Sequence, residues 1–122
     1  MWANPGLVKA FVVVGSIPKN TFAKLGASDG LVTAATAATD TANGVVQAID
    51  AADGEHCDLI MGGIAKVTAG GAIALGAQVT PGADGKAVAA ASGNKVAGIA
   101  VEAATADGQV IPVLLTPGGF TA

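Results

Sequence analysis

Residue types that readily do chemistry are scarce in this sequence, and only His56 and Cys57 stand side by side like a nucleophile and its base. A catalytic dyad needs a hydrogen bond between the two side chains. Residues 56–61, HCDLIM, are composed like a strand, and neighbouring strand residues point to opposite faces. We therefore expect an exposed histidine beside a small buried thiol rather than a catalytic pair.

Metal and cofactor sites lack their usual residue patterns. One histidine and one cysteine cannot complete a zinc site, and the densest acidic group lacks the spacing of a calcium-binding EF-hand loop. The glycines form neither GxGxxG nor GxxxxGK[ST]. The sequence thus predicts no catalytic, cofactor-binding or metal-binding residue. An unassigned acid–base pair stays an open alternative, because Asp and Glu are present. The acidic group consists of Asp50, Asp53, Glu55 and Asp58.

The charge of the chain argues against a nucleic-acid partner. Its 122 residues carry a net charge of −3, and all six cationic residues are lysines. The planar arginine fork that binds phosphates and guanines is missing, and so is a basic stripe. The apolar run at 10–14 is too short to span a membrane or to serve as a signal-peptide core. We therefore predict no nucleic-acid partner, no membrane partner and a mature chain that begins near Met1.

Turn signals divide the chain into short segments. Asp-Gly and other glycine-containing pairs recur between runs of about five to eight residues, which is typical of strands and hairpins. The sequence predicts a mostly β fold, a small β-barrel or β-sandwich, β-tulip-like, with an extended N-terminal arm. Pro112 in one run indicates an edge strand or a bulge. Residues 34–42 have helical propensity, but their interleaved threonines favour a non-helical structure. The expected strands are 7–14, 31–36, 45–49, 56–61, 64–67, 78–80, 86–90, 96–101 and 109–115.

Parts of the chain resemble each other. Residues 29–36 read DGLVTAAT and residues 84–91 read DGKAVAAA, and Asp53-Gly54 aligns with Asp107-Gly108 at a similar offset. We predict a repeat of 29–63 by 84–119, although biased composition could produce the same likeness. The predicted organisation is an N-terminal arm and first strand at 1–18, followed by one β-rich domain at 19–122.

The few large aromatic side chains lie mainly near the chain ends. Aromatic residues make up only 3% of the chain, and alanine and glycine supply much of the rest. A core so thin in large side chains would gain stability from association. Because tryptophan is favoured at binding hot spots, we predict an interface with another molecule at the ends, with Trp2 folding back on its own domain as the alternative. The candidate interface residues are Trp2, Pro5, Phe11 and Phe120.

Two long segments carry a resemblance to a known family. AKVTAGGAIALGAQVTPGADGKAVAA at 65–90 and GNKVAGIAVEAATADGQVIPVLL at 93–115 are similar to the capsid decoration or cement proteins of tailed bacteriophages, more narrowly the DUF2190-type family. The likeness covers roughly 62–116 and is a pattern of turns and strands. The first residues depart from the short extended arm expected of that family, which leaves the mode of attachment open.

The resemblance implies a structural protein of the virion, made in the host cytoplasm. Such a protein binds the outer surface of the phage head, contacts the major capsid protein and stabilises the shell. It also implies self-association, as a homotrimer with a dimer as the alternative, and no cofactor. A β-rich binding or adhesion module of a surface assembly is the competing interpretation. That class usually needs exposed aromatics, which the body of this chain lacks.

Overall fold

The computed structural model describes residues 4–46 and 50–121. Side chains are described at 8–46, at 50–116 and at Thr121. Within these residues there is no helix, so none that could cross a membrane. The mostly β fold is therefore confirmed. The strands are β1 (Asn4–Val13), β2 (Thr21–Leu25), β3 (Leu31–Ala34), β4 (Gly44–Val46), β5 (His56–Thr68), β6 (Gln78–Pro81), β7 (Ala87–Ala89), β8 (Lys95–Ala100) and β9 (Val110–Thr121).

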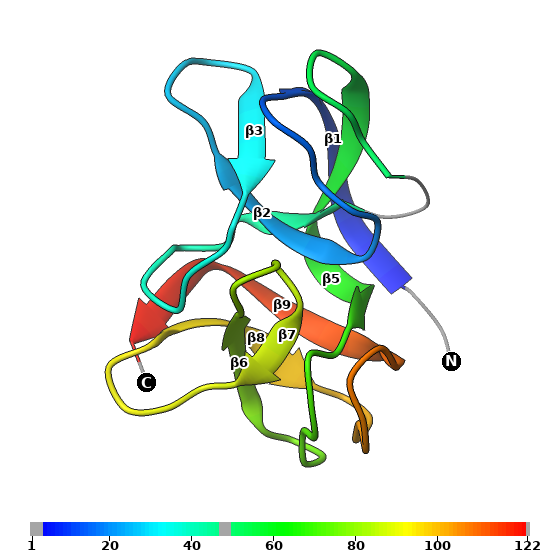
Figure 1. The fold of residues 1–122 in the computed structure, drawn as a ribbon, viewed down its shortest axis with the longest axis vertical. Coiled ribbons are helices and arrows are strands. Elements are labelled where there is room, and N and C mark those ends of the chain that lie inside the picture. The colour runs from blue at the N-terminus through cyan, green and yellow to red at the C-terminus, as the bar shows by residue number, and fades with distance from the viewer. Residues whose placement is uncertain (1–3, 47–49, 122) are drawn as a thin grey trace.

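The first half of the chain closes into a five-stranded barrel. Its strands follow the order β1-β3-β2-β4-β5, and β5 pairs back onto β1. The β1–β3 pair is parallel and the other four are antiparallel. β5 then continues past the barrel into the second half, where the order is β5-β9-β8-β6-β7. Figure 1 shows β5 running from one half of the molecule to the other.

The second half repeats the pairings of the first. Its β5–β9, β9–β8, β8–β6 and β6–β7 pairs are antiparallel, and a parallel bridge from Ala69 to Ala87 joins the end of β5 to β7. Each of these has a counterpart of the same direction in the first barrel. Contacts outside the ladders match as well. The matching pairs, first half then second, are Ile17–Ala51 with Ile73–Ala104, and Val13–Gly54 with Ala69–Gly108.

Four Asp-Gly pairs make the hairpin connections that the sequence predicts. They lie between β2 and β3, β4 and β5, β6 and β7, and β8 and β9, which are all antiparallel neighbours. The glycines adopt positive φ, which a residue with a side chain adopts at a cost. Their φ values are 79° at Gly30, 82° at Gly54, 80° at Gly85 and 93° at Gly108.

Three sequence predictions about single elements are wrong. The expected strands do not include the short strand β2. The predicted strands 56–61 and 64–67 are one strand, because Gly62-Gly63 forms no turn: it lies opposite β1 at a register shift, with Gly63 at φ 80°. Pro112 lies on a central strand with no register shift beside it. Proline has no backbone N–H to donate, but Pro112 lies just past the end of the β8–β9 ladder, so no ladder hydrogen bond is lost. The Pro112 carbonyl still accepts a hydrogen bond from Val101 N at 3.0 Å.

Two apolar clusters form the core. Inward-facing residues of β1 to β5, such as Val13, Val32 and Leu59, fill the first barrel. The second cluster fills the other half, and it includes Phe22, Val45 and Ile60 from the outer side of the first barrel. The two halves are therefore packed against each other through a shared core as well as joined by β5. Among the described residues, valines make up most of the largest fully buried side chains, which agrees with the expected shortage of large ones.

Candidate functional site

His56 and Cys57 take the positions expected of strand neighbours. His56 is exposed, whereas Cys57 is 5% exposed and faces the interior of the first barrel. Burial, with a smaller contribution from the Asp58 carboxylate, raises the pKa of the Cys57 thiol. Since a thiolate is the reactive form of cysteine, this pair is arranged for packing rather than for nucleophilic chemistry.

The acidic residues near Asp50 hold loops in place. Asp50 accepts a hydrogen bond from Lys19 N and Asp53 accepts one from Gly15 N, each at 2.9 Å. Glu55 accepts a hydrogen bond from Ala52 N at 2.6 Å. Among the described residues no three His, Cys, Asp or Glu side chains are grouped to hold a metal ion. Asp50 and Asp53 therefore link the loop after β1 to the loop before β5, and Glu55 braces the second loop internally.

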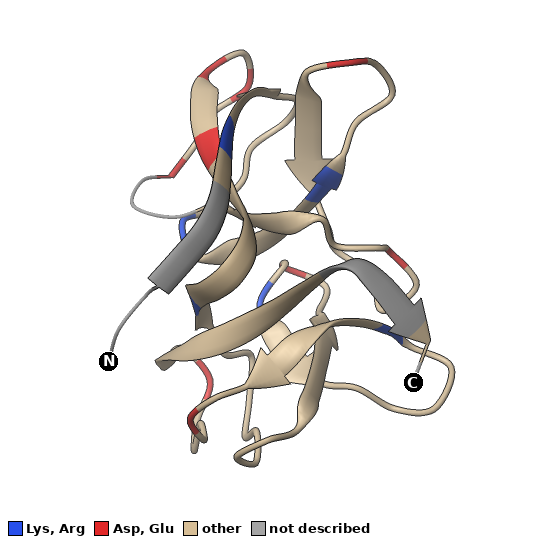
Figure 2. Cartoon of the chain, turned by 180° about the vertical axis from the view of Figure 1, so that it is seen from behind, with Lys and Arg blue, Asp and Glu red and all other residues tan. Residues whose placement is uncertain are grey.

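Charge is distributed unequally between loops and strands. Of the nine acidic residues only Asp58 lies on a strand, whereas four of the six lysines do. Figure 2 shows the acidic residues mostly in the connecting loops. Lys86 joins two such loops through Asp84 and Asp107, at 3.4 and 3.2 Å. The connecting loops are therefore net negative and the strands net positive. The strand lysines are Lys9, Lys24, Lys66 and Lys95.

The predicted interface residues lie in different surroundings. Trp2 lies outside the described residues. Pro5 is on β1, where its backbone is opposite Gly63, and Phe120 is on β9, opposite Val96. Phe11 is only 6% exposed and belongs to the core of the first barrel, with the Lys9 ammonium 4.9 Å from its ring centre. Of the three described candidates, Pro5 and Phe11 therefore lie in the β1–β5 ladder and Phe120 lies in the β8–β9 ladder, and the Phe11 ring is not presented as an exposed anchor.

Among the residues that the structure describes, the last part of β9 pairs with a strand on one side only, which makes it a sheet edge. The ladder between β9 and β5 ends at Leu114, whereas the ladder between β9 and β8 continues to Thr121 after a register shift. In the first half β5 takes the place that β9 takes in the second, and the end of β5, from Ile64 to Thr68, pairs with β9. The stretch from Thr116 to Thr121 thus occupies the place where a further strand would join, and an unpaired strand edge is a template for pairing with another chain.

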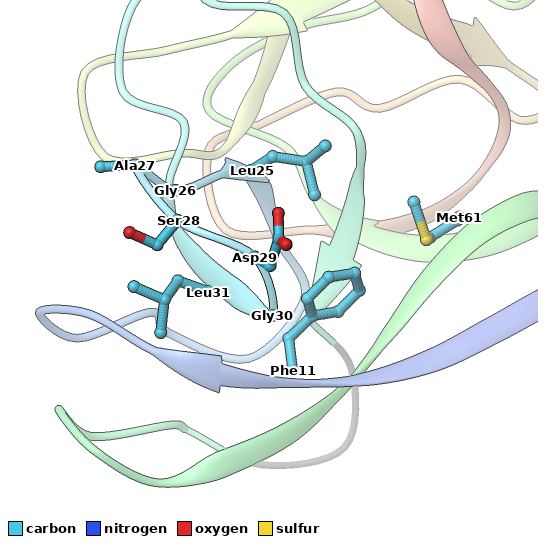
Figure 3. A pocket seen from close by; sticks show the side chains of 9 residues that line it. All are labelled: Phe11, Leu25, Gly26, Ala27, Ser28, Asp29, Gly30, Leu31 and Met61. Carbon is cyan, nitrogen blue, oxygen red and sulfur yellow. The ribbon is translucent and has the colours of Figure 1, made fainter.

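A pocket of about 360 Å³ opens into the first barrel beside the β2–β3 hairpin. Figure 3 shows the side chains of Phe11, Leu25 and Met61 around it, with the hairpin loop at its rim. Leu25 is 50% exposed. Sequence reasoning missed this pocket because it did not predict β2, and Asp29-Gly30 was the only signal of a hairpin there. The lining residues are Phe11, Leu25, Gly26, Ala27, Ser28, Asp29, Gly30, Leu31 and Met61.

The fold and these surfaces define a small β-barrel protein with a strand edge and an apolar pocket available for binding. The family model described as phage cement protein matches residues 8–115. The crystal structure of head fiber gp8.5 N base in bacteriophage phi29 has the same fold, with a TM-score of 0.71 and 20% sequence identity. The match covers 95% of this chain and 98% of that one. No curated protein matches the chain.

The chain belongs to the phage cement protein family, because the family model matches most of its length. It is accordingly a structural, head-associated component of the virion, located at the capsid surface. The resemblance drawn from the sequence segments 65–90 and 93–115 is confirmed, and the match extends to the first half of the chain as well.

Proposed function

We propose that this protein binds the outer surface of the assembled phage head, contacts the major capsid protein and reinforces the shell. The observation that carries the proposal is the family match over residues 8–115. The fold supports it, since an all-β body with a shared core makes a compact and rigid clamp. The proposed role includes no catalytic step and no cofactor, and its partners include neither nucleic acid nor a membrane.

The end of β9 and the start of β1 are the proposed attachment sites. Strand addition to a sheet edge forms main-chain hydrogen bonds, and side chains beside the edge supply specificity. The edge from Thr116 to Thr121 carries Phe120, and the N-terminal end of β1 carries Pro5 and follows Trp2. We therefore retain Trp2, Pro5 and Phe120 as interface candidates. The Phe11 ring is 6% exposed, so it is not proposed as a projecting anchor.

We further propose that the protein acts as a homotrimer on the capsid, with a dimer as the alternative. Several modest contacts made at once give an avidity that no single contact reaches. The β9 edge on every copy offers such a contact, either to a neighbouring copy or to the capsid. Light scattering during size-exclusion chromatography, together with the copy number on purified particles, measures both states.

Co-sedimentation with expanded heads that lack this protein tests the proposed function. The wild-type protein should pellet with the heads at a saturable, regular stoichiometry. Removing residues 1–3, which leaves β1 whole, or replacing Trp2→Ala should weaken binding by about tenfold or more if Trp2 is a hot spot. His56→Ala, at an exposed barrel position, is the matched control and should bind like wild type. Wild-type protein that stays in the supernatant would refute the proposed function.

A further inference from the structure

The two halves of the fold differ at the opening beside their first hairpin. In the second half, residues 20–22 of the first half lie between β5 and the β6–β7 hairpin. Asn20 O accepts a hydrogen bond from Thr68 N at 2.8 Å, and Phe22 N donates to Gly85 O at 2.9 Å. The second half therefore holds an extended segment from outside itself at this opening.

The equivalent opening of the first half holds no such segment among the described residues. There Val12 N donates directly to Gly30 O at 2.9 Å. Val12 and Gly30 correspond to Thr68 and Gly85, because the neighbouring bonds Val14–Val32 and Gly70–Ala87 match. The two groups that bind the inserted segment in one half thus bind each other in the other half.

The side chain of Phe22 fills the opening of the second half. Phe22 is fully buried, and its cluster includes Val67 on β5 and Leu115 on β9. The residues at the same positions of the first half are Phe11 on β1 and Met61 on β5. Both line the open pocket of about 360 Å³. The pocket is therefore the place that Phe22 occupies in the other half.

Building on the proposed function, we propose that this pocket receives an aromatic side chain from an extended segment of a different virion protein. The segment would lie along the outside of the β2–β3 hairpin and insert its ring into the pocket, because Val12 N and Gly30 O already bind each other and leave no place for a backbone between them. The pocket volume lies within the range of about 300–1,000 Å³ that ligand sites usually have. The Phe11 ring and the Met61 sulfur offer edge and sulfur contacts that favour an aromatic guest.

A second copy of this chain is the less suitable occupant. The segment of the second half that corresponds to Asn20–Phe22 is Gly76–Gln78, since Asn20 and Gly76 share positive φ values of 60° and 79°. If a second copy inserted its segment Gly76–Gln78 into the pocket, the amide of Gln78 would lie where Phe22 places its apolar ring in the other half. Phe22 of a second copy is fully buried in its own core.

Photo-crosslinking on assembled heads identifies the occupant. p-Benzoylphenylalanine would be placed at position 25, and at position 75 as the control. Leu25 and Leu75 are both exposed leucines. Leu75 belongs to the connection between β5 and β6, and Figure 1 shows this connection at the opposite end of the molecule from the β2–β3 hairpin. We expect a crosslink from position 25 to an aromatic-containing segment of another virion protein. A crosslink to a second copy, equal yields from both positions, or no crosslink from position 25 would overturn the proposal.

Charge placed at the rim gives an independent measurement. Leu25→Asp should weaken co-sedimentation with heads by about tenfold or more, as expected for a buried apolar hot spot. Leu75→Asp should leave it unchanged. Equal binding of Leu25→Asp and wild-type protein would overturn the pocket assignment while leaving the proposed function standing. If wild-type protein itself failed to bind heads, both proposals would fall.

Discussion

At the scale of single residues, Gly44 and Gly98 permit the closest approaches between strands. A Cβ atom at Gly44 would lie 2.5 Å from Ile60 O and 2.7 Å from Leu59 Cγ. At Gly98 it would lie 2.5 Å from Val113 Cγ1 and 2.6 Å from Leu114 O. The two glycines occupy equivalent places, on β4 against β5 and on β8 against β9. Each half thus has a glycine at this place, where a side chain would collide with the neighbouring strand.

We predict that Gly44→Ala and Gly98→Ala each lower the free energy of unfolding by about 1–3 kcal/mol, because the added methyl group overpacks the strand pair. Urea denaturation followed by circular dichroism measures this. Gly71→Ala is the control, since a methyl group added there would meet no atom within 4 Å and the φ of Gly71 is not positive. Loss of stability at Gly71 equal to that at Gly44 would contradict the packing explanation.

The ion pair between Lys24 and Asp40 makes the stability of the fold depend on pH. Partial burial opposes ionisation of Asp40, but hydrogen bonds from Lys24 and Thr36 N and the Lys24 charge outweigh it and lower the pKa of Asp40 below its ordinary 3.8. The carboxylate therefore stabilises the fold above the unfolded-state pKa, and this contribution is lost as pH falls through the lower folded-state pKa.

Asp40→Asn should cost less than about 1 kcal/mol at neutral pH, because Lys24 is partly exposed and such pairs are weak. As the pH falls below the folded-state pKa of Asp40, the variant and wild type should converge in stability, since the carboxylate is then protonated in both the folded and the unfolded state. Thermal melts of both proteins from neutral pH down to strongly acidic pH measure the difference. A difference that stays constant over that whole range would show that the charge of Asp40 is not its cause.

At the scale of elements, the sequence predicted what depends on local turn chemistry and missed what depends on tertiary contacts. The four Asp-Gly hairpins were predictable, because aspartate followed by glycine suits a tight turn. β2 was not, since TFAKL has no strong alternation and becomes a strand by pairing with β3 and β4. Gly62-Gly63 reads as a turn, yet tertiary pairing with β1 draws it into β5.

The interface candidates show the same limit. Phe11 looked like an anchor because aromatics are rare, but alternation along β1 turns it into the barrel beside Val13. The pocket depended on side chains from β1, β2 and β5 that come together only in three dimensions. The opposite orientation of His56 and Cys57 was predictable, since strand alternation alone separates the two side chains.

β2 also connects the two halves, through Phe22. We predict that Phe22→Ala lowers the free energy of unfolding by about 3–5 kcal/mol, because it leaves a cavity in the second core. Phe22→Leu should cost distinctly less. Chemical denaturation of the three proteins measures the series. A cost for Phe22→Ala below about 1 kcal/mol, far under the usual range for such a truncation, would show that the segment 20–22 does not fill the second half.

At the scale of the whole molecule, we propose that the chain consists of two copies of one β unit that share β5. The matched strand pairings, the matched bridges and the equivalent glycines support this proposal. The boundaries of the repeat, 29–63 and 84–119, stay a prediction. The division of the chain into an arm at 1–18 and a domain at 19–122 stays a prediction as well. β1, which falls in the first part of that division, pairs with both β3 and β5.

A shared strand and a shared core predict a single unfolding transition. Cys57 reports on the first half, because its thiol becomes reactive only when that barrel opens. Cys57 labelling and far-ultraviolet circular dichroism should therefore give coincident urea midpoints. Labelling that is complete at a urea concentration where half the β signal remains would show that the barrel unfolds on its own.

The central claim is that this protein binds the outside of the phage head and reinforces it. A cryo-electron microscopy reconstruction of expanded heads saturated with the purified protein tests that claim most directly. We predict additional density at symmetry-related positions on the outer surface, into which this β-barrel fits with the β9 edge or the β2–β3 hairpin against another chain. Bare heads at saturating protein, or density confined to the inner surface, would contradict the account.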